Sequence, residues 1–288
     1  MSTNLPRVSL GHWPTPIHPL ERLGRALGGR RLWVKRDDLS GLAGGGNKTR
    51  KLERLLADAL TQDATTLITV GAPQSNHARQ TAAAAARYGL RCMLVLGGLA
   101  PAEITGNLLL DRLLGATVRW AGDRDRFALL EEVAAEERAA GRRPYIIPYG
   151  GSNPIGAAAY ASAMDELVRQ CHQQGIAPDR IVFASSSGGT QAGLVVGARA
   201  NNLSAQVLGI SVDRPAEELA RGIYELAIMT ADLLQLRFEI EPQWVQVNDA
   251  YLGGGYAVLG DAEREAIRLA ARIEGLLLDP VYTGRAMA

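Results

Sequence analysis

Residues 66–96 read TLITVGAPQSNHARQTAAAAARYGLRCMLVL. Two strand-length apolar runs, Thr66–Gly71 and Arg91–Leu96, enclose the segment 76–88, which contains five alanines in succession. Alanine favours a helix because it loses no side-chain entropy there, whereas the flanking runs are rich in branched residues. A strand, a helix and a strand in this order predict a βαβ unit with parallel strands and a right-handed crossover.

The same alternation continues along the whole chain. Further strands are predicted at 32–35, 117–121, 145–148, 180–184, 206–212 and 244–247. Further helices are predicted at 48–61, 103–114, 126–140, 156–174, 189–200, 216–234 and 261–274. This pattern indicates an α/β fold of doubly wound parallel sheets with helices on both faces. In such sheets, ligands bind beyond the carboxyl ends of the strands, where the glycine-rich loops of this chain collect.

Composition narrows the function classes. The 288 residues suggest one or two domains, and 31 basic residues nearly balance 30 acidic ones, so a nucleic-acid partner is not expected. The N-terminal segment has no apolar signal-peptide region and the apolar runs are too short to span a membrane, which predicts a cytoplasmic protein. Cys92 and Cys171 are expected to be reduced structural thiols, and the four scattered histidines predict no metal site.

Lysine usage singles out one residue. Only three of the basic residues are lysines, namely Lys35, Lys48 and Lys51. A bias toward arginine accounts for the scarcity, but arginine cannot replace lysine as a Schiff-base amine. Lys48 follows the loop SGLAGGGN at 40–47 and begins a predicted helix, whose N-terminal field favours the neutral amine. Lys48 is therefore the predicted covalent cofactor lysine, whereas Lys51 is expected to face solvent or to pack its stem.

A nucleotide-dependent enzyme is the rival interpretation of this loop. Gly41 and Gly46 have the spacing of the phosphate-binding motif G-x-x-x-x-G-K-[ST]. Asn47 separates Gly46 from Lys48, however, and no predicted strand ends in an aspartate suited to holding magnesium. The spacing therefore disfavours an ATPase.

Two more loops follow predicted strands and open predicted helices. The loop ASSSGGTQAG at 184–193 offers small residues, hydroxyls and helix N-terminal amides, which favours a site for a single phosphate. Its alternative is a serine–glycine turn without a ligand. The loop GAPQSNHAR at 71–79 contains Ser75 and Asn76, either of which could be a helix N-cap. The same amides and hydroxyl could instead hold a substrate carboxylate.

Several ordered segments together carry a family resemblance. They read LGHWPTP at 10–16, LWVKRDD at 32–38, GGNKTRKLE at 45–53, QSNH at 74–77, SGGTQAG at 187–193 and LDPVYTG at 278–284. The chain resembles the fold-type II pyridoxal 5'-phosphate (PLP) enzymes, in the group with 1-aminocyclopropane-1-carboxylate (ACC) deaminase, D-cysteine desulfhydrase and L-cysteate sulfo-lyase. The resemblance implies a tryptophan synthase β-like fold, a homodimer, and PLP in a cleft between two domains. The expected domains are a large PLP-binding one, 1–49 with 165–288, and a smaller inserted one, 50–164.

The resemblance also implies residue roles. Lys48 holds PLP, Asn76 donates a hydrogen bond to its phenolic oxygen, and Ser75 receives the substrate carboxylate. The remaining roles are a phosphate cup formed by Ser187, Gly188, Gly189 and Thr190, and a pair of tyrosines, Tyr256 and Tyr282, that flank the substrate.

Thr283 indicates the reaction. In the deaminases a glutamate at this position pairs with the pyridine nitrogen, whereas desulfhydrase-like members carry threonine. A hydroxyl cannot supply the negative charge that keeps this nitrogen protonated, which favours elimination of a good leaving group. The expected activity is PLP-dependent carbon–sulfur lysis of a small amino acid such as D-cysteine, giving pyruvate, ammonia and sulfide.

Three alternatives stay open at this point. Two are an L-cysteate sulfo-lyase and an ACC deaminase, which the same motifs allow. The third is a truncated, inactive PLP-binding homologue, because relatives continue for several tens of residues beyond the position where this chain ends.

Overall fold

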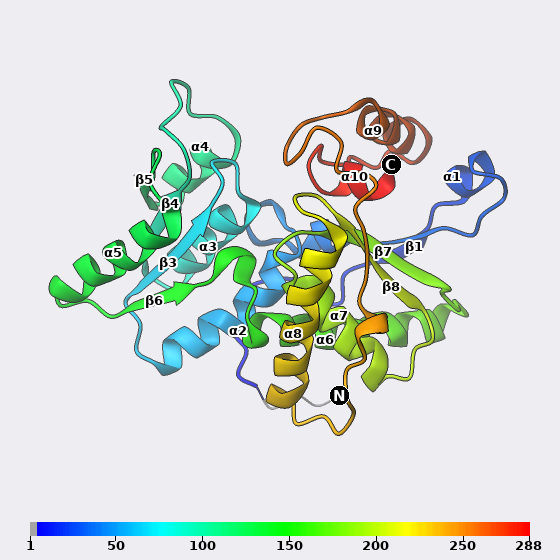
Figure 1. Cartoon of the computed structure of the whole chain (residues 1–288), viewed down its shortest axis with the longest axis horizontal. Coiled ribbons are helices and arrows are strands. Elements are labelled where there is room, and N and C mark those ends of the chain that lie inside the picture. The colour runs from blue at the N-terminus through cyan, green and yellow to red at the C-terminus, as the bar shows by residue number, and fades with distance from the viewer. Residues whose placement is uncertain (1–4) are drawn as a thin grey trace. The chain divides into compact units, whose positions relative to one another are not determined.

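The computed structural model describes residues 5–288, which divide into two compact units (Figure 1). The C-terminal unit comprises Pro14–Arg36 and Tyr160–Ala288, and the central unit comprises residues 5–13 and Asp37–Ala159. The boundaries expected from the sequence, 49/50 and 164/165, differ from these positions. The segment before Lys48 groups with the central unit because its side chains and carbonyls bond to helices of that unit.

The central unit contains a four-stranded parallel sheet with the strand order β5-β4-β3-β6. Its strands are β3 (Thr66–Gly71), β4 (Arg91–Leu96), β5 (Thr117–Trp120) and β6 (Pro144–Ile147). Its helices are α2 (Lys48–Thr61), α3 (Asn76–Arg87), α4 (Gly106–Leu113) and α5 (Arg126–Ala139), with the 3-10 turns η1 (Asp37–Ser40), η2 (Leu42–Gly44) and η3 (Tyr149–Gly151).

Both faces of this sheet are buried, because successive side chains of β3 point to opposite sides. Leu67 belongs to the core that α2 and α3 form, whereas Ile68 and Val70 belong to the core under α5. Such continuous apolar strands are typical of parallel sheets covered on both faces.

The C-terminal unit contains a three-stranded parallel sheet with the order β7-β8-β9 and a two-stranded antiparallel sheet of β1 and β2. Its strands are β1 (Ile17–Pro19), β2 (Trp33–Lys35), β7 (Arg180–Ser185), β8 (Gln206–Ser211) and β9 (Gln246–Asn248). Its helices are α1 (Glu21–Ala26), α7 (Gly189–Ala200), α8 (Ala216–Leu233), α9 (Asp261–Glu274) and α10 (Thr283–Met287), with the 3-10 turn η4 (Pro242–Trp244), and α6 (Pro154–Gln174) spans the boundary at 159/160. The predicted α/β class with two doubly wound parallel sheets is confirmed.

Two kinds of feature are absent from residues 5–288. Among the helices described there, none has both the length and the apolar character that a membrane crossing requires. In the same range, no group of three or more histidine, cysteine or acidic side chains is arranged to bind a metal ion.

Candidate functional site

Lys48 begins α2 directly after a tightly turned loop. Gly45 in this loop has a φ of +73°, and a Cβ atom there would lie 1.8 Å from the carbonyl oxygen of Asp38. Only glycine combines this left-handed backbone with so close an approach. The loop therefore places Lys48 at the helix start by a path that no other residue at position 45 allows.

The Lys48 amine is suited to nucleophilic chemistry. The side chain is half-buried, and burial lowers the pKa of its amine from 10.5 to about 8. At pH 7.5, roughly a quarter of such amines are neutral, against roughly one in a thousand at the ordinary pKa. Within residues 5–288, the amine has no hydrogen bond or ion pair that would hold it in the charged form.

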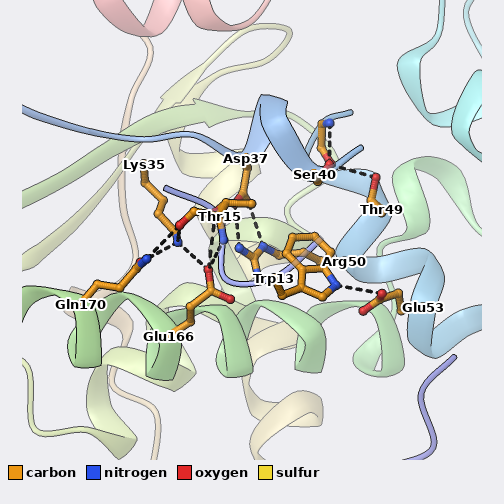
Figure 2. A network of polar contacts seen from close by, with 11 residues as sticks. Trp13, Thr15, Lys35, Asp37, Ser40, Thr49, Arg50, Glu53, Glu166 and Gln170 are labelled. Carbon is orange, nitrogen blue, oxygen red and sulfur yellow. Dashed lines mark hydrogen bonds and ion pairs between the residues drawn. The ribbon is translucent and has the colours of Figure 1, made fainter. Parts of the chain in front are cut away.

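Hydrogen bonds connect the loop before Lys48 to α2 (Figure 2). Ser40 Oγ accepts from the Gly46 amide at 2.9 Å and donates to Thr49 Oγ1 at 3.2 Å. Arg50 donates two hydrogen bonds to the Asp37 carboxylate, at 2.9 and 2.8 Å. These contacts explain why threonine and arginine follow Lys48 in the sequence.

Trp13 adds a third attachment in the central unit (Figure 2). The Arg50 guanidinium lies 4.0 Å from the centroid of the Trp13 ring, and Trp13 Nε1 donates to Glu53 Oε1 at 2.8 Å. Two of the quoted motifs, LGHWPTP and GGNKTRKLE, thus contact each other. In the C-terminal unit, Lys35 Nζ binds Glu166 Oε1 at 2.5 Å, which gives this second lysine a structural ion pair.

Lys51 does not face solvent, which was one of the two expectations for this residue; it is buried, so its stem packs inside the unit. Its side chain is 0% exposed, and Nζ donates to the Gly150 carbonyl at 3.1 Å and to Ser152 Oγ at 3.2 Å. Burial and the neighbouring charge of Lys48 hold the pKa of Lys51 well below its ordinary value. No local pattern signals this burial, because both partners lie about a hundred positions away along the chain.

Ser75 is the N-cap of α3, as one of the two sequence interpretations has it. Its Oγ accepts a hydrogen bond from the Ala78 amide at 3.1 Å. A Cβ atom at Gly71 would lie 2.9 Å from this oxygen, so glycine there permits the approach. The hydroxyl proton has no acceptor within residues 5–288 and can donate to a ligand.

Asn76, the first residue of α3, lies in the same part of the central unit as Lys48. The charge on Lys48 is one cause, after burial, of the low pKa of the adjacent His77 imidazole. Asn76 Oδ1 accepts from Asn107 Nδ2 at 2.9 Å. In the described chain, the Nδ2 group of Asn76 has no partner and is available as a donor.

In the C-terminal unit, the turn Ser187–Thr190 leads from β7 into α7. Gly188 is the N-cap, with a φ of +83°, and a Cβ atom there would lie 3.0 Å from Ile223 Cγ1. Gly189 and Thr190 begin the helix. A glycine turn at a helix N-terminus is the kind of place where a phosphate binds to backbone amides.

The two predicted tyrosines meet in this unit. The hydroxyls of Tyr256 and Tyr282 are 2.9 Å apart, and their rings pack edge to face with centroids 6.2 Å apart. Arg285, which is 1% exposed, donates to the carbonyls of Gly255 and Val258 and thereby anchors the loop that carries Tyr256. Sequence reasoning missed Arg285, because no motif distinguishes it from the many other arginines.

Thr283 begins α10, next to Tyr282. Its hydroxyl donates to Asp279 Oδ1 at 2.7 Å and accepts from the Asp279 amide at 2.8 Å. The Asp279 carboxylate also accepts from the amides of Val281 and Tyr282. Asp279 therefore fixes the turn that contains Tyr282 and Thr283. This explains the aspartate in the motif LDPVYTG.

Within each unit, the structure groups predicted site residues. The central unit contains Lys48, Ser75 and Asn76. The C-terminal unit contains Ser187, Gly188, Gly189, Thr190, Tyr256, Tyr282 and Thr283.

The chain matches a known protein family and is similar to named proteins. Residues 8–288 match the family described as pyridoxal-phosphate dependent enzymes. The chain is 43% identical to a D-cysteine desulfhydrase of Salmonella typhi, with 99% of this chain and 88% of that protein covered. It is also 43% identical to a 1-aminocyclopropane-1-carboxylate deaminase of Burkholderia orbicola (strain MC0-3), with 98% of this chain and 87% of that protein covered.

Solved structures agree with the sequence matches. A crystal structure described as an ACC deaminase homologue is 42% identical, with a TM-score of 0.90, and the match covers 98% of this chain and 85% of that one. A crystal structure of a threonine deaminase is 23% identical, with a TM-score of 0.64 and coverage of 94% and 84%, and shows a likeness of fold alone. The predicted resemblance is confirmed.

Proposed function

Because this chain belongs to the family of pyridoxal-phosphate dependent enzymes, in the group of ACC deaminase and D-cysteine desulfhydrase, we propose that it is a D-cysteine desulfhydrase-like carbon–sulfur lyase. The choice of reaction rests on the residue at position 283. The residue after Tyr282 is the neutral Thr283, whose hydroxyl is bonded to Asp279, so that position supplies no carboxylate to a pyridine nitrogen.

The residues of the chain fit PLP. Lys48 offers a half-buried amine of lowered pKa, and Asn76 offers an amide donor that has no other partner within residues 5–288. The turn at Gly188 and Gly189 offers a helix N-terminus for the phosphate. When bound, PLP supplies an electron-withdrawing ring that takes up the electron pair left at the substrate's α-carbon.

Lys48 has two tasks in the proposed reaction. Its neutral amine would hold the cofactor covalently, and the same amine, when not bound to the cofactor, would accept the substrate's α-proton. A pKa of about 8 suits both tasks, since the amine is then available in both protonation states near neutral pH.

Ser75 and the tyrosine pair position the substrate. The Ser75 hydroxyl, with its proton unused, donates to the substrate carboxylate at the N-terminus of α3, where the helix dipole also favours an anion. Tyr256 and Tyr282 would flank the substrate, as the family resemblance implies. D-cysteine and water then yield pyruvate, ammonia and hydrogen sulfide, a balanced reaction that needs no oxidant or reductant.

ACC deaminase is the second candidate, because the relative with that name is as similar to this chain as the desulfhydrase. An L-cysteate sulfo-lyase would share the first steps and release sulfite. The deciding experiment incubates the PLP-loaded protein with D-cysteine, L-cysteine, L-cysteate and ACC, and measures the oxo acid together with sulfide or sulfite.

The outcomes of this experiment separate the candidates. Oxo acid with sulfide from D-cysteine, faster than from the other three compounds, supports the desulfhydrase. Faster turnover of ACC would replace it by the deaminase. A cofactor absorbance band without turnover of any compound would identify an inactive PLP-binding homologue.

We also propose that the protein is a homodimer in the cytoplasm. Cys92 and Cys171 are both free and buried, which suits a reducing compartment. Sedimentation equilibrium of the purified protein and fractionation of cells that express it test the two statements.

A further inference from the structure

Asn107, the second residue of α4, contacts the start of α3, where Asn76 lies, and the residue Gln74 just before it. Its Nδ2 group donates to Asn76 Oδ1 at 2.9 Å and to the carbonyl of Gln74 at 2.7 Å. Its Oδ1 accepts from Arg79 Nη1 at 3.0 Å. One amide side chain thus connects Arg79 to Asn76.

The chemistry of the partners fixes the direction of this chain of hydrogen bonds. A guanidinium only donates, so the end of Asn107 that faces Arg79 is its oxygen. A backbone carbonyl only accepts, so the end that faces Gln74 is its nitrogen. Asn107 therefore presents N–H groups to Asn76, and Asn76 must present its oxygen in return. The nitrogen of Asn76 is then turned away from Asn107, as a donor for another partner.

Arg79 and Asn107 are themselves held in place. Arg79 Nη2 donates at 3.0 Å to the carbonyl of Gly45, in the loop before Lys48. The Gln74 side chain accepts from the Asn107 amide at 2.8 Å and donates to the Thr105 carbonyl at 3.1 Å. The first turn of α4 is thus joined to the Ser75–Asn76 loop through both main chain and side chains.

Asp111 lies one helical turn after Asn107, on the same face of α4. Its carboxylate is fully buried and interacts electrostatically with Arg79. When ionised, this carboxylate helps keep the guanidinium beside Asn107, but among the described residues Asp111 makes no hydrogen bond to the amides.

We propose that Asn107 is a positioning residue that, oriented by Arg79, fixes the Asn76 amide with its N–H groups toward the phenolic oxygen of PLP. The proposal rests on the proposed function, which has Asn76 facing that oxygen. A donated hydrogen bond favours the ionised form of the oxygen. Asn107 itself does not touch the cofactor, and its effect is transmitted through the direction of one amide.

Two substitutions separate this role from a general effect on folding. Asn107→Asp keeps the size and the bond from Arg79, but a carboxylate cannot donate to Asn76, so the Asn76 amide turns and presents its oxygen to PLP. Asn107→Ala is neutral and leaves the Asn76 amide without an orienting partner. Asn248→Asp makes the same chemical change where the oxygen only accepts, from the Ala250 amide at 2.8 Å, and is the matched control.

The measurement is a pH titration of the cofactor's absorbance band in each PLP-loaded protein. We expect the midpoint to rise by about one pH unit in Asn107→Asp, a tenfold change in the proton equilibrium, and by a smaller amount in Asn107→Ala. The control Asn248→Asp is expected to keep the wild-type midpoint. An unchanged midpoint in Asn107→Ala would overturn the inference even if Asn107→Asp shifts, since charge alone would then explain the shift.

Borohydride reduction and peptide mapping of the same samples distinguish failure of the role of Asn107 from failure of the proposed function. An adduct on Lys48 with unshifted midpoints in both Asn107 variants overturns the role of Asn107 alone. Absence of an adduct from Lys48 in the wild type overturns the proposed function, and the inference with it.

Discussion

The substitution Gly45→Ala tests whether the loop before Lys48 tolerates a side chain at position 45. A Cβ atom at position 45 would lie 1.8 Å from the Asp38 carbonyl oxygen, which is main chain and cannot swing away. The backbone also has a φ of +73° and a ψ of −177°, a region that essentially only glycine adopts, which costs an L-residue about 1–3 kcal/mol. Relief of the clash adds about 1–3 kcal/mol, so the expected loss of unfolding free energy is about 2–6 kcal/mol.

Gly44→Ala is the matched control. Gly44 has a φ of +85°, but the nearest atom to its added Cβ would be Arg79 Nη1 at 4.0 Å, the end of a side chain. It should lose only the backbone cost of about 1–2 kcal/mol. Urea unfolding followed by far-ultraviolet circular dichroism measures both variants, and cofactor absorbance reports the effect on Lys48. Equal losses in the two variants would refute the reasoning from the Asp38 contact.

Three further predictions concern other parts of the molecule. Gly188→Val is expected to weaken PLP binding about ten- to a hundredfold, measured by absorbance titration, because its φ is +83° and Ile223 lies 3.0 Å from the added Cβ; unchanged affinity would place the phosphate elsewhere. Burial raises the pKa of the Asp111 carboxyl to about 7, although nearby Arg79 lowers it, so the folded protein binds this proton more tightly than the unfolded chain does. The unfolding free energy is therefore expected to fall as the pH rises from about 4 to about 7. Asp111→Asn should remove that fall in urea titrations, and an unaltered slope would contradict the assignment. Thr283→Glu should slow elimination from D-cysteine about ten- to a hundredfold, or about 1.4–2.8 kcal/mol of barrier, in a sulfide-release assay, whereas an equal or faster rate would count against the role given to Thr283.

The regular elements were largely predictable because local patterns determine them. The helices at 48–61, 189–200 and 261–274 and the strands at 66–71 and 91–96 have the predicted bounds. The helix predicted from 103 starts instead at Gly106. The reason is that Thr105 is extended and Gln74, a residue distant in sequence, caps the start by accepting from the Asn107 amide.

Features that depend on distant partners were not predictable. Strand β1 and helix α1 are short and have no clear pattern, and they exist because β1 pairs with β2 and Glu274 accepts from the Leu23 amide. The burial of Lys51 and the role of Asn107 likewise depend on carbonyls and side chains far along the chain. Lys48 was predictable, since a glycine loop, a helix start and a scarce lysine coincide in one short segment.

Borohydride reduction of the loaded protein followed by peptide mapping tests most directly whether PLP attaches to Lys48. We expect a stable adduct on Lys48, and loss of that adduct in Lys48→Arg, which keeps the positive charge but has no nucleophilic amine. An adduct on Lys35 or Lys51 in the wild type, or an adduct that persists in Lys48→Arg, would contradict it.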